Sequence, residues 1–184
     1  MTRPKGSAFH RTSEPGPANA EKDAFVARYG GVYEHSPWVA EAVFGQPGTD
    51  TLDGLQAAMR AVVDGSDDGR KRALLRAHPE LACGRVEALT EASRGEQRSA
   101  GLDACTAEEA SQFQRLNDAY RRKFGFPFII AVKGLDRQAI LAAFRARIEN
   151  DFDTEFRTAL EQVHRIAGLR LQAIGSGRAA RRKR

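Results

Sequence analysis

Residues Thr154–Ile174 read TEFRTALEQVHRIAGLRLQAI and carry the apolar spacing of one long helix. The apolar positions recur at steps of three and four residues, the spacing of a single helix face: Phe156, Leu160, Val163 and Ala167. The same spacing places Arg170 and then Ile174 on that face. This stretch therefore predicts a helix that buries an apolar stripe and carries one arginine within it.

Helical spacing also dominates the chain outward from this stretch. The segments that predict helices are residues 20–32, 36–45, 51–63, 67–77, 106–120 and 136–148. Thr106 and Glu109 have the spacing of a capping box, Asp136 is a typical N-cap, and Pro79 disfavours helix at the residue before it. The apolar run FGFPFIIAV, residues 124–132, is broken by glycine and proline, so we expect a buried extended segment. The chain is thus predicted to be all-α, with seven to eight helices in a single compact domain.

The composition is that of a soluble globular protein of 184 residues, 41% of them apolar. No apolar stretch approaches the roughly 18 residues of a transmembrane helix, so we expect no membrane contact. Residues 1–20 are rich in Pro, Gly, Ser and charge, and we predict a disordered leader without the apolar region of a secretory signal. The folded domain is expected over residues 21–174, followed by a basic tail at 175–184.

The formal net charge of +5 comes mostly from that tail, which holds five cations in its last seven residues. One alternative is therefore a helical nucleic-acid-binding protein that uses the basic tail. A basic tail is usually solvated, however, and says nothing about the folded part. Cys83 and Cys105 have neither metal-ligand nor framework spacing, so we expect two ordinary packing residues in a reducing cytoplasm.

His78 is the first candidate for chemistry. It shares a helix face with Leu74 and Leu75, so its imidazole is expected to point inward at the end of a helix. The helix C-terminus favours the imidazolium and burial disfavours it, and a pKa near neutrality suits proton transfer. The spacing by itself favours a plainer interpretation, a core histidine bonded to a backbone carbonyl, and both interpretations stay open.

Ser93, Glu96 and Gln97 fall on one face of a helical turn, where a hydroxyl, a carboxylate and an amide can converge on a polar substrate. The Ser-x-x-Glu spacing is also that of a capping box, which the local pattern favours. Arg170 stays ionised when buried, so it needs either an internal carboxylate or an anionic ligand. Snorkelling of Arg170 to the surface is the alternative.

No dinucleotide, P-loop, zinc-protease, Cys/His metal or nucleophile-elbow motif occurs in the chain. If the protein is an enzyme, cofactor-free and metal-free chemistry is what remains. The buried backbone of residues 128–132 must find hydrogen-bond partners, and either an amide-rich ligand or a neighbouring helix end would supply them. A helical interaction module, with exposed aromatic side chains around Trp38, is a further alternative.

Four segments taken together resemble a known family. They are HPEL at 78–81, LTEASRGEQRSAGL at 89–102, LNDAYRRKFGFPFIIAV at 116–132 and EQVHRIAGLRL at 161–171. In order and interval they resemble 2-oxo-4-hydroxy-4-carboxy-5-ureidoimidazoline (OHCU) decarboxylases, over roughly residues 23–174. The resemblance implies an all-helical, cofactor-independent carboxy-lyase, commonly a homodimer. Its reaction would convert OHCU to (S)-allantoin in the catabolism of urate, a purine.

The resemblance also implies roles for single residues. His78 matches the family's catalytic histidine and is expected to act as general acid/base, with Glu96 as a second catalytic residue that also binds substrate. The other matches are to substrate-binding positions: Pro79, Ser93, Gln97, Phe128, Ile129, Ile130, Ala131, Val132 and Arg170. We expect no cofactor, no metal and no nucleic-acid partner.

Overall fold

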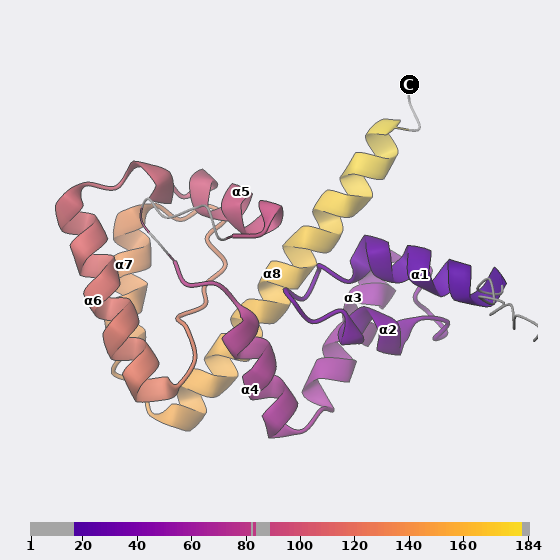
Figure 1. Cartoon of the computed structure of the whole chain (residues 1–184), viewed down its shortest axis with the longest axis horizontal. Helices are drawn as coiled ribbons and strands as arrows, with labels where there is room; N and C mark the ends of the chain where they lie inside the picture. The colour runs from indigo at the N-terminus through magenta and orange to yellow at the C-terminus, as the bar shows by residue number, and fades with distance from the viewer. Residues whose placement is uncertain (1–16, 82, 84–88, 182–184) are drawn as a thin grey trace, which may run out of the picture.

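The helix predicted near the C-terminus is the longest element of the structure (Figure 1). The computed structural model describes residues 17–81, 83 and 89–181, and within those ranges every regular element is helical. The elements are α1 (Pro17–Tyr29), α2 (Trp38–Val43), α3 (Leu52–Asp64), α4 (Asp68–Ala77), α5 (Glu91–Ser99), the 3₁₀ helix η1 (Leu102–Ala104), α6 (Ala107–Phe124), α7 (Arg137–Arg147) and α8 (Phe152–Arg181). The all-α prediction is confirmed for this part of the chain.

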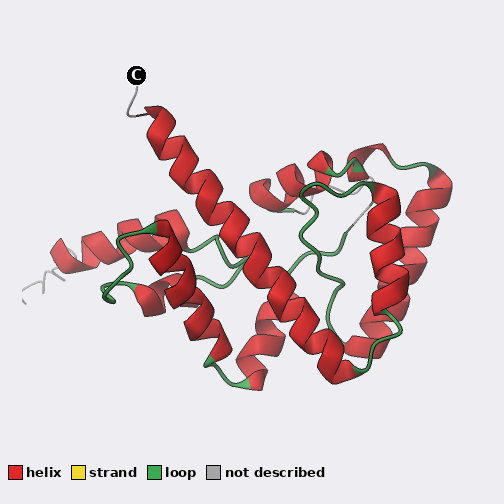
Figure 2. Ribbon diagram, turned by 180° about the vertical axis from the view of Figure 1, so that it is seen from behind, coloured by secondary structure: helices red, strands yellow, loops and turns green. Residues whose placement is uncertain are grey.

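Helix α8 runs diagonally through the molecule and separates two groups of helices (Figure 1). One group is α1, α2 and α3, and the other is α5, α6 and α7. The view from behind shows the same division (Figure 2). Helices α3, α4 and α6 contact α8 directly. A side chain on α8 can therefore meet partners from both ends of the sequence.

The predicted stripe of α8 is buried in its middle and half-buried at its two ends. Val163 and Ala167 are each 1% exposed and Leu160 is 8% exposed, whereas Phe156 and Ile174 are half-buried. Burying one Val or Leu side chain contributes about 1.5–3 kcal/mol, so this stripe fixes the helix in the core. Arg170 is also only 8% exposed, although it carries a charge.

The helix boundaries that depend on local capping are confirmed. Thr106 and Glu109 form both bonds of the capping box that starts α6. The Asp136 side chain accepts a hydrogen bond from a backbone N–H in the first turn of α7. Helix α4 ends directly before His78, whose backbone is extended (ψ 138°), as the following Pro79 favours.

The capping interpretation of Ser93 and Glu96 is wrong. Helix α5 begins earlier, because Thr90 is its N-cap and accepts a hydrogen bond from the Ser93 N–H at 3.3 Å. Ser93 therefore lies inside the helix, where it is 3% exposed. Its hydroxyl, like the carboxylate of Glu96, is left for contacts with other elements.

The residues after α6 form the predicted buried extended segment, and Figure 2 draws them as loop. Phe128 and Ile129 are 1% and 3% exposed. The Ile129 carbonyl accepts a hydrogen bond from Arg147 of α7 at 2.7 Å, and the Ala131 N–H donates to Gln162 of α8 at 3.0 Å. Side chains of two helices thus form the hydrogen bonds to this backbone that a neighbouring strand would otherwise form.

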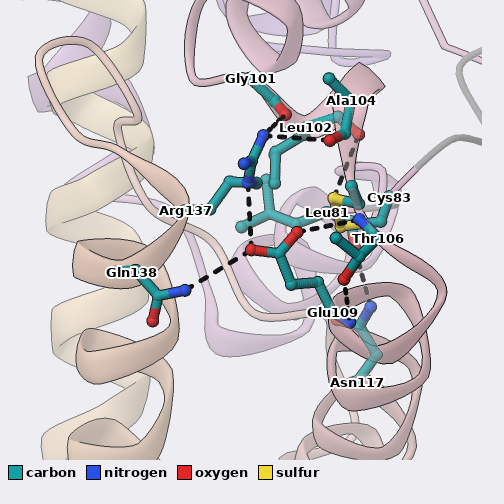
Figure 3. Close-up of a disulfide and its surroundings, with 11 residues drawn as sticks. Leu81, Cys83, Gly101, Leu102, Ala104, Thr106, Glu109, Asn117, Arg137 and Gln138 are labelled. Atoms are coloured by element: carbon teal, nitrogen blue, oxygen red, sulfur yellow. Dashed lines mark hydrogen bonds and ion pairs between the residues drawn. A yellow bond between two sulfur atoms is a disulfide. The ribbon is translucent and has the colours of Figure 1, made fainter.

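Cys83 and Cys105 form a disulfide, so the prediction of two ordinary packing residues is wrong (Figure 3). The cysteines are separated by 22 residues, and the fold brings their Cα atoms to 5.6 Å. Beside the disulfide, Asn117 of α6 donates to the carbonyl of Leu81 at 2.9 Å. Disulfides persist mainly in oxidising environments, so the cysteines no longer support a reducing compartment.

The ends of the folded region extend further than predicted. Residues 17–20 of the predicted leader belong to α1, and residues 175–181 of the predicted tail continue α8. Residues 1–16 and 182–184 lie outside the described part of the chain. No helix in the described part is long and apolar enough to cross a membrane. Trp38 is only partly exposed, with the Arg70 guanidinium 5.1 Å from its ring centre.

Candidate active site

His78 lies at the end of α4, and the helix itself orients its ring. The Nδ1–H of His78 donates to the carbonyl of Leu74 at 3.1 Å, so Nε2 is the acceptor nitrogen of the neutral ring. Burial lowers the pKa of His78, although the Leu74 carbonyl and the Glu34 carboxylate act in the opposite direction. At neutral pH the ring is therefore an uncharged base. The bond to a backbone carbonyl, which the plainer interpretation predicted, is present.

Arg170 of α8 is turned toward α5. Its Nε and Nη2 atoms donate to the two carboxylate oxygens of Glu96 at 2.7 and 2.8 Å. Nη2 also donates to the Ser93 hydroxyl at 3.0 Å. Burial alone would lower the pKa of Arg170, but the carboxylates of Glu96 and Glu34 outweigh it and raise the pKa. The guanidinium is thus charged, buried and paired, and the snorkelling interpretation is wrong.

Glu34, in the turn between α1 and α2, is the residue of this site that the sequence did not single out. It is 2% exposed, and one of its oxygens lies 2.9 Å from Arg170 Nη2. Burial alone would raise the pKa of Glu34, but hydrogen bonds from Ser93 and Thr90 and the charge of Arg170 together lower it. A buried arginine needs an anion, and that requirement is the one sequence signal that pointed to such a residue.

The residues that follow His78 are held from two helices. Gln97 of α5 donates to the carbonyl of Glu80 at 3.0 Å. Asn117 of α6 donates to the carbonyl of Leu81 at 2.9 Å. Pro79, between these anchors and His78, restricts the backbone further. The segment that carries the imidazole is therefore fixed on both sides.

These side chains line one cleft of about 350 Å³. The predicted site residues that line it are His78, Pro79, Ser93, Glu96, Gln97, Phe128, Ile129, Ile130, Val132 and Arg170. Glu34, Leu81 and Ile166 complete the lining. Ala131 does not line this cleft, and its N–H donates to Gln162 instead. The structure thus brings together ten of the eleven predicted residues, including the imidazole and the guanidinium.

A second, wider depression of about 950 Å³ adjoins the cleft between α5 and α8. Ala131 lines this depression. The two hollows share four residues: Glu96, Val132, Ile166 and Arg170. Glu96 and Arg170 therefore lie where the outer depression passes into the cleft.

The arrangement suits the binding of a small anion and the movement of a proton on it. A guanidinium binds a carboxylate in a fixed geometry, and the neutral imidazole can accept a proton. The apolar wall of residues 128–132 lowers the local polarity, which strengthens the charged contacts. Within the ranges that the structure covers, no group of three or more His, Cys, Asp or Glu residues is placed to hold a metal ion.

Two other histidines lie outside the cleft. His164 of α8 is buried, with 3% of its surface exposed. Its Nε2–H donates to Asp64 at 3.0 Å, and its Nδ1 accepts from the Tyr33 hydroxyl at 2.8 Å. His35 is exposed, with a positive φ of 52°. Neither of these histidines competes with His78 for the role of base in the cleft.

Comparison with known proteins points to one family. A sequence profile described as OHCU decarboxylase matches residues 18–172. A protein from Haloferax volcanii named 2-oxo-4-hydroxy-4-carboxy-5-ureidoimidazoline decarboxylase is 46% identical over 151 residues, which cover 82% of this chain and 89% of the relative.

Two solved structures are also similar. The crystal structure of (S)-allantoin synthase is 36% identical with a TM-score of 0.67, covering 83% of this chain and 50% of that longer one. The crystal structure of an OHCU decarboxylase in the presence of (S)-allantoin has a TM-score of 0.62 and covers 76% of this chain and 91% of that one. Its identity is 24%, so that likeness concerns the fold alone.

Proposed function

The chain belongs to the OHCU decarboxylase family, and from this premise we propose that it is a carboxy-lyase that converts OHCU to (S)-allantoin in urate degradation. The observation that carries the proposal is the placement of the His78 imidazole and the Arg170 guanidinium in one cleft. Each of these groups has a use in the reaction, because the substrate is a small carboxylate that must exchange protons. The reaction is proposed to need no cofactor.

In the proposed mechanism the substrate itself accepts the electrons of the bond that breaks. The carboxylate leaves as CO₂, and its electron pair enters the adjacent imidazolinone ring. The neutral His78 ring takes the hydroxyl proton as that carbon becomes a carbonyl, and water gives a proton to the ring nitrogen that received the electron pair. The protonated His78 ring then gives its proton to one face of the neighbouring ring carbon, which yields one allantoin enantiomer. General acid/base help of this kind contributes roughly a hundredfold to ten-thousandfold.

The other side chains are proposed to position the substrate. Arg170 binds the substrate carboxylate, while Ser93, Glu96 and Gln97 contact its ureido and ring groups. The backbone of residues 128–132 and Pro79 form the wall against which the ring packs. Fixing the reacting groups in one geometry contributes a further part of the rate.

The test of the proposal is to generate OHCU from urate in solution, add the protein, and follow the optical activity of allantoin by circular dichroism. We expect the wild-type protein to give (S)-allantoin, whereas spontaneous decay gives a racemate. His78→Ala should remove this enantioselective release of CO₂. His78→Asn keeps a donor for the Leu74 carbonyl but no base at neutral pH, and it should be equally inactive.

His35→Asn is the matched control, since this exposed histidine lies outside the cleft and asparagine tolerates its positive φ. It should turn over like the wild type. A wild-type protein that leaves the allantoin racemic would exclude the proposed activity. A His78→Ala protein with wild-type turnover would instead exclude only the role of His78.

We further propose that the active form is a homodimer and that it works in the cytoplasm, as the family resemblance implies. Light scattering at micromolar concentration tests the assembly, and a monomer would exclude it. The Cys83–Cys105 disulfide is the feature that counts against a strongly reducing compartment. Counting free thiols in protein alkylated before cell lysis decides whether this bond forms where the enzyme works.

A further inference from the structure

We infer that Glu34 is the positioning residue of this site: it holds Arg170 and Ser93 in place from the protein side, while Glu96 is the partner that yields to substrate. The inference rests on the proposed function, because it assigns Arg170 to the substrate carboxylate. It adds to that function a division of labour between two carboxylates that touch the same guanidinium.

Both carboxylate oxygens of Glu34 accept hydrogen bonds. One oxygen accepts a hydrogen bond from the Thr90 hydroxyl at 2.5 Å. The other accepts from the Ser93 hydroxyl at 2.5 Å and from Arg170 at 2.9 Å. Thr90 caps α5, Ser93 lies in the first turn of α5, and Arg170 belongs to α8. Glu34 therefore joins three separate parts of the chain at one buried point.

Glu96 has the same charge but a different environment. Its side chain is 32% exposed, whereas that of Glu34 is 1% exposed. Both of its oxygens accept hydrogen bonds from Arg170, at 2.7 and 2.8 Å. A substrate carboxylate would need these same N–H donors of Arg170. Glu96 can release them to an incoming anion because water can solvate it. Glu34 has no such alternative, since leaving Arg170 would strand a buried charge.

This asymmetry explains how Arg170 stays oriented when its partner changes. If Glu96 were its one partner, an arriving substrate would leave the guanidinium without a fixed contact on the protein side. Nη2 donates to Glu34 and Ser93 as well as to Glu96, and Nη1 donates to the Gly31 carbonyl at 3.4 Å. The guanidinium therefore keeps contacts on the protein side when substrate takes the place of Glu96. The geometry is thus built before substrate binds, which favours affinity.

Glu34 also contributes to the charge balance at His78. Three charged groups face this imidazole: Glu34 from the α1–α2 turn, Glu96 from α5 and Arg170 from α8. The two carboxylates favour the protonated ring, and Arg170 disfavours it. Removing the charge of Glu34 should therefore lower the pKa of His78 further. A residue with only a structural role would not move this pKa.

The decisive variant is Glu34→Gln in the full chain, assayed with OHCU generated in solution. We expect KM to rise about tenfold or more, because a charge-assisted contact to Arg170 is lost, while kcat changes much less. The pH limb of kcat/KM that belongs to His78 should shift to lower pH. Both readouts follow from position and charge rather than from loss of folded protein.

Tyr33→Phe is the matched control, because it removes a buried polar group next in sequence that bonds to His164 and does not line the cleft. We expect a lower melting temperature with unchanged KM and an unchanged pH profile. The inference is overturned if Glu34→Gln behaves in the same way. A wild-type protein without turnover would overturn the proposed function, and this inference with it.

If Glu34→Gln does not fold, Thr90→Val decides the question. This change removes the Thr90 hydroxyl, which donates to Glu34 and accepts the capping bond from the Ser93 N–H, while Thr90 itself does not line the cleft. It should raise KM several-fold, and Thr90→Ser, which keeps the hydroxyl, should restore it. Equal KM values in Thr90→Val and the wild type would again overturn the inference.

Discussion

Arg170, which is buried, and Arg147, which is mostly buried, have similar kinds of partners but different surroundings. Arg170 on α8 pairs with Glu34 and Glu96, and Arg147 at the end of α7 pairs with Glu155. The Arg147 side chain is 12% exposed and the Glu155 side chain 0%. Each arginine lies within a set of carboxylate, hydroxyl and backbone partners, so the residue types alone do not tell the two sites apart.

The surroundings of Arg147 contain nothing that a ligand could replace. Its Nε donates to Glu155 at 3.0 Å, its Nη2 donates to the same oxygen, and its Nη1 donates to the carbonyl of Ile129 at 2.7 Å. Glu155 also accepts hydrogen bonds from Tyr120 and from Asn150. The guanidinium lies 4.5 Å from the ring centre of Phe128. This is a closed set of contacts that supports the wall of the cleft from behind.

The surroundings of Arg170 contain a partner that can leave. Glu96 is 32% exposed at its side chain and borders both the cleft and the outer depression. The comparison teaches that a buried ion pair is not by itself a sign of function. The pair that we propose to bind substrate differs in having a cavity beside it and one carboxylate partner that is partly exposed.

Removing the guanidinium of Arg170 tests whether this arginine binds substrate. Arg170→Met should lower kcat/KM by about a thousandfold, because truncating one partner of a charged contact costs roughly 2–5 kcal/mol. Its free energy of unfolding should also fall, because Glu34 keeps two hydroxyl donors but its buried charge loses the guanidinium that neutralises it. Steady-state kinetics and urea unfolding measure the two effects. An Arg170→Met protein with wild-type KM would make this arginine structural.

At the Arg147–Glu155 pair we expect a loss of stability with most of the activity retained. Arg147→Met should lower the free energy of unfolding by about 3–5 kcal/mol, because it leaves the charge of Glu155 buried and unpaired. The folded fraction should keep most of its kcat/KM, since the change reaches the cleft through the wall residues Phe128 and Ile129 and not through a group that binds substrate. Arg145→Met, exposed on the same helix, is the control and should leave stability almost unchanged. Loss of activity without loss of stability at Arg147 would erase the distinction between the two sites.

The same comparison shows what the sequence could and could not predict. Arg170 was found because it interrupts an apolar stripe, and Thr106 and Asp136 were found because a cap is a local pattern. Glu34 meets Arg170 across 136 positions, and Tyr33 meets His164 across 131. No periodicity encodes such contacts. They arise when α8 passes between the two groups of helices, so only the fold reveals them.

Stability should also depend weakly on pH, through two buried histidines and not through either arginine. Burial lowers the pKa of His164, although Asp64 and Glu161 oppose this and Arg60 adds to it. Burial likewise lowers the pKa of His78. The unfolded chain therefore binds more protons below about pH 6.5, so stability is complete above that pH and is lost as the pH falls. Each histidine contributes at most about 1.4 kcal/mol per pH unit.

Urea unfolding at pH 7.5, 6.5 and 5.5 measures this loss. Glu34 cannot cause it, because its pKa is lowered from 4.5 and its contribution disappears only in more acidic solution. His164→Gln should reduce the slope of stability against pH, while His35→Asn, exposed and outside both clusters, should leave it unchanged. An unreduced slope in His164→Gln would mean that His164 is not the group that titrates. His78, the other histidine whose pKa burial lowers, would then be the source of the slope.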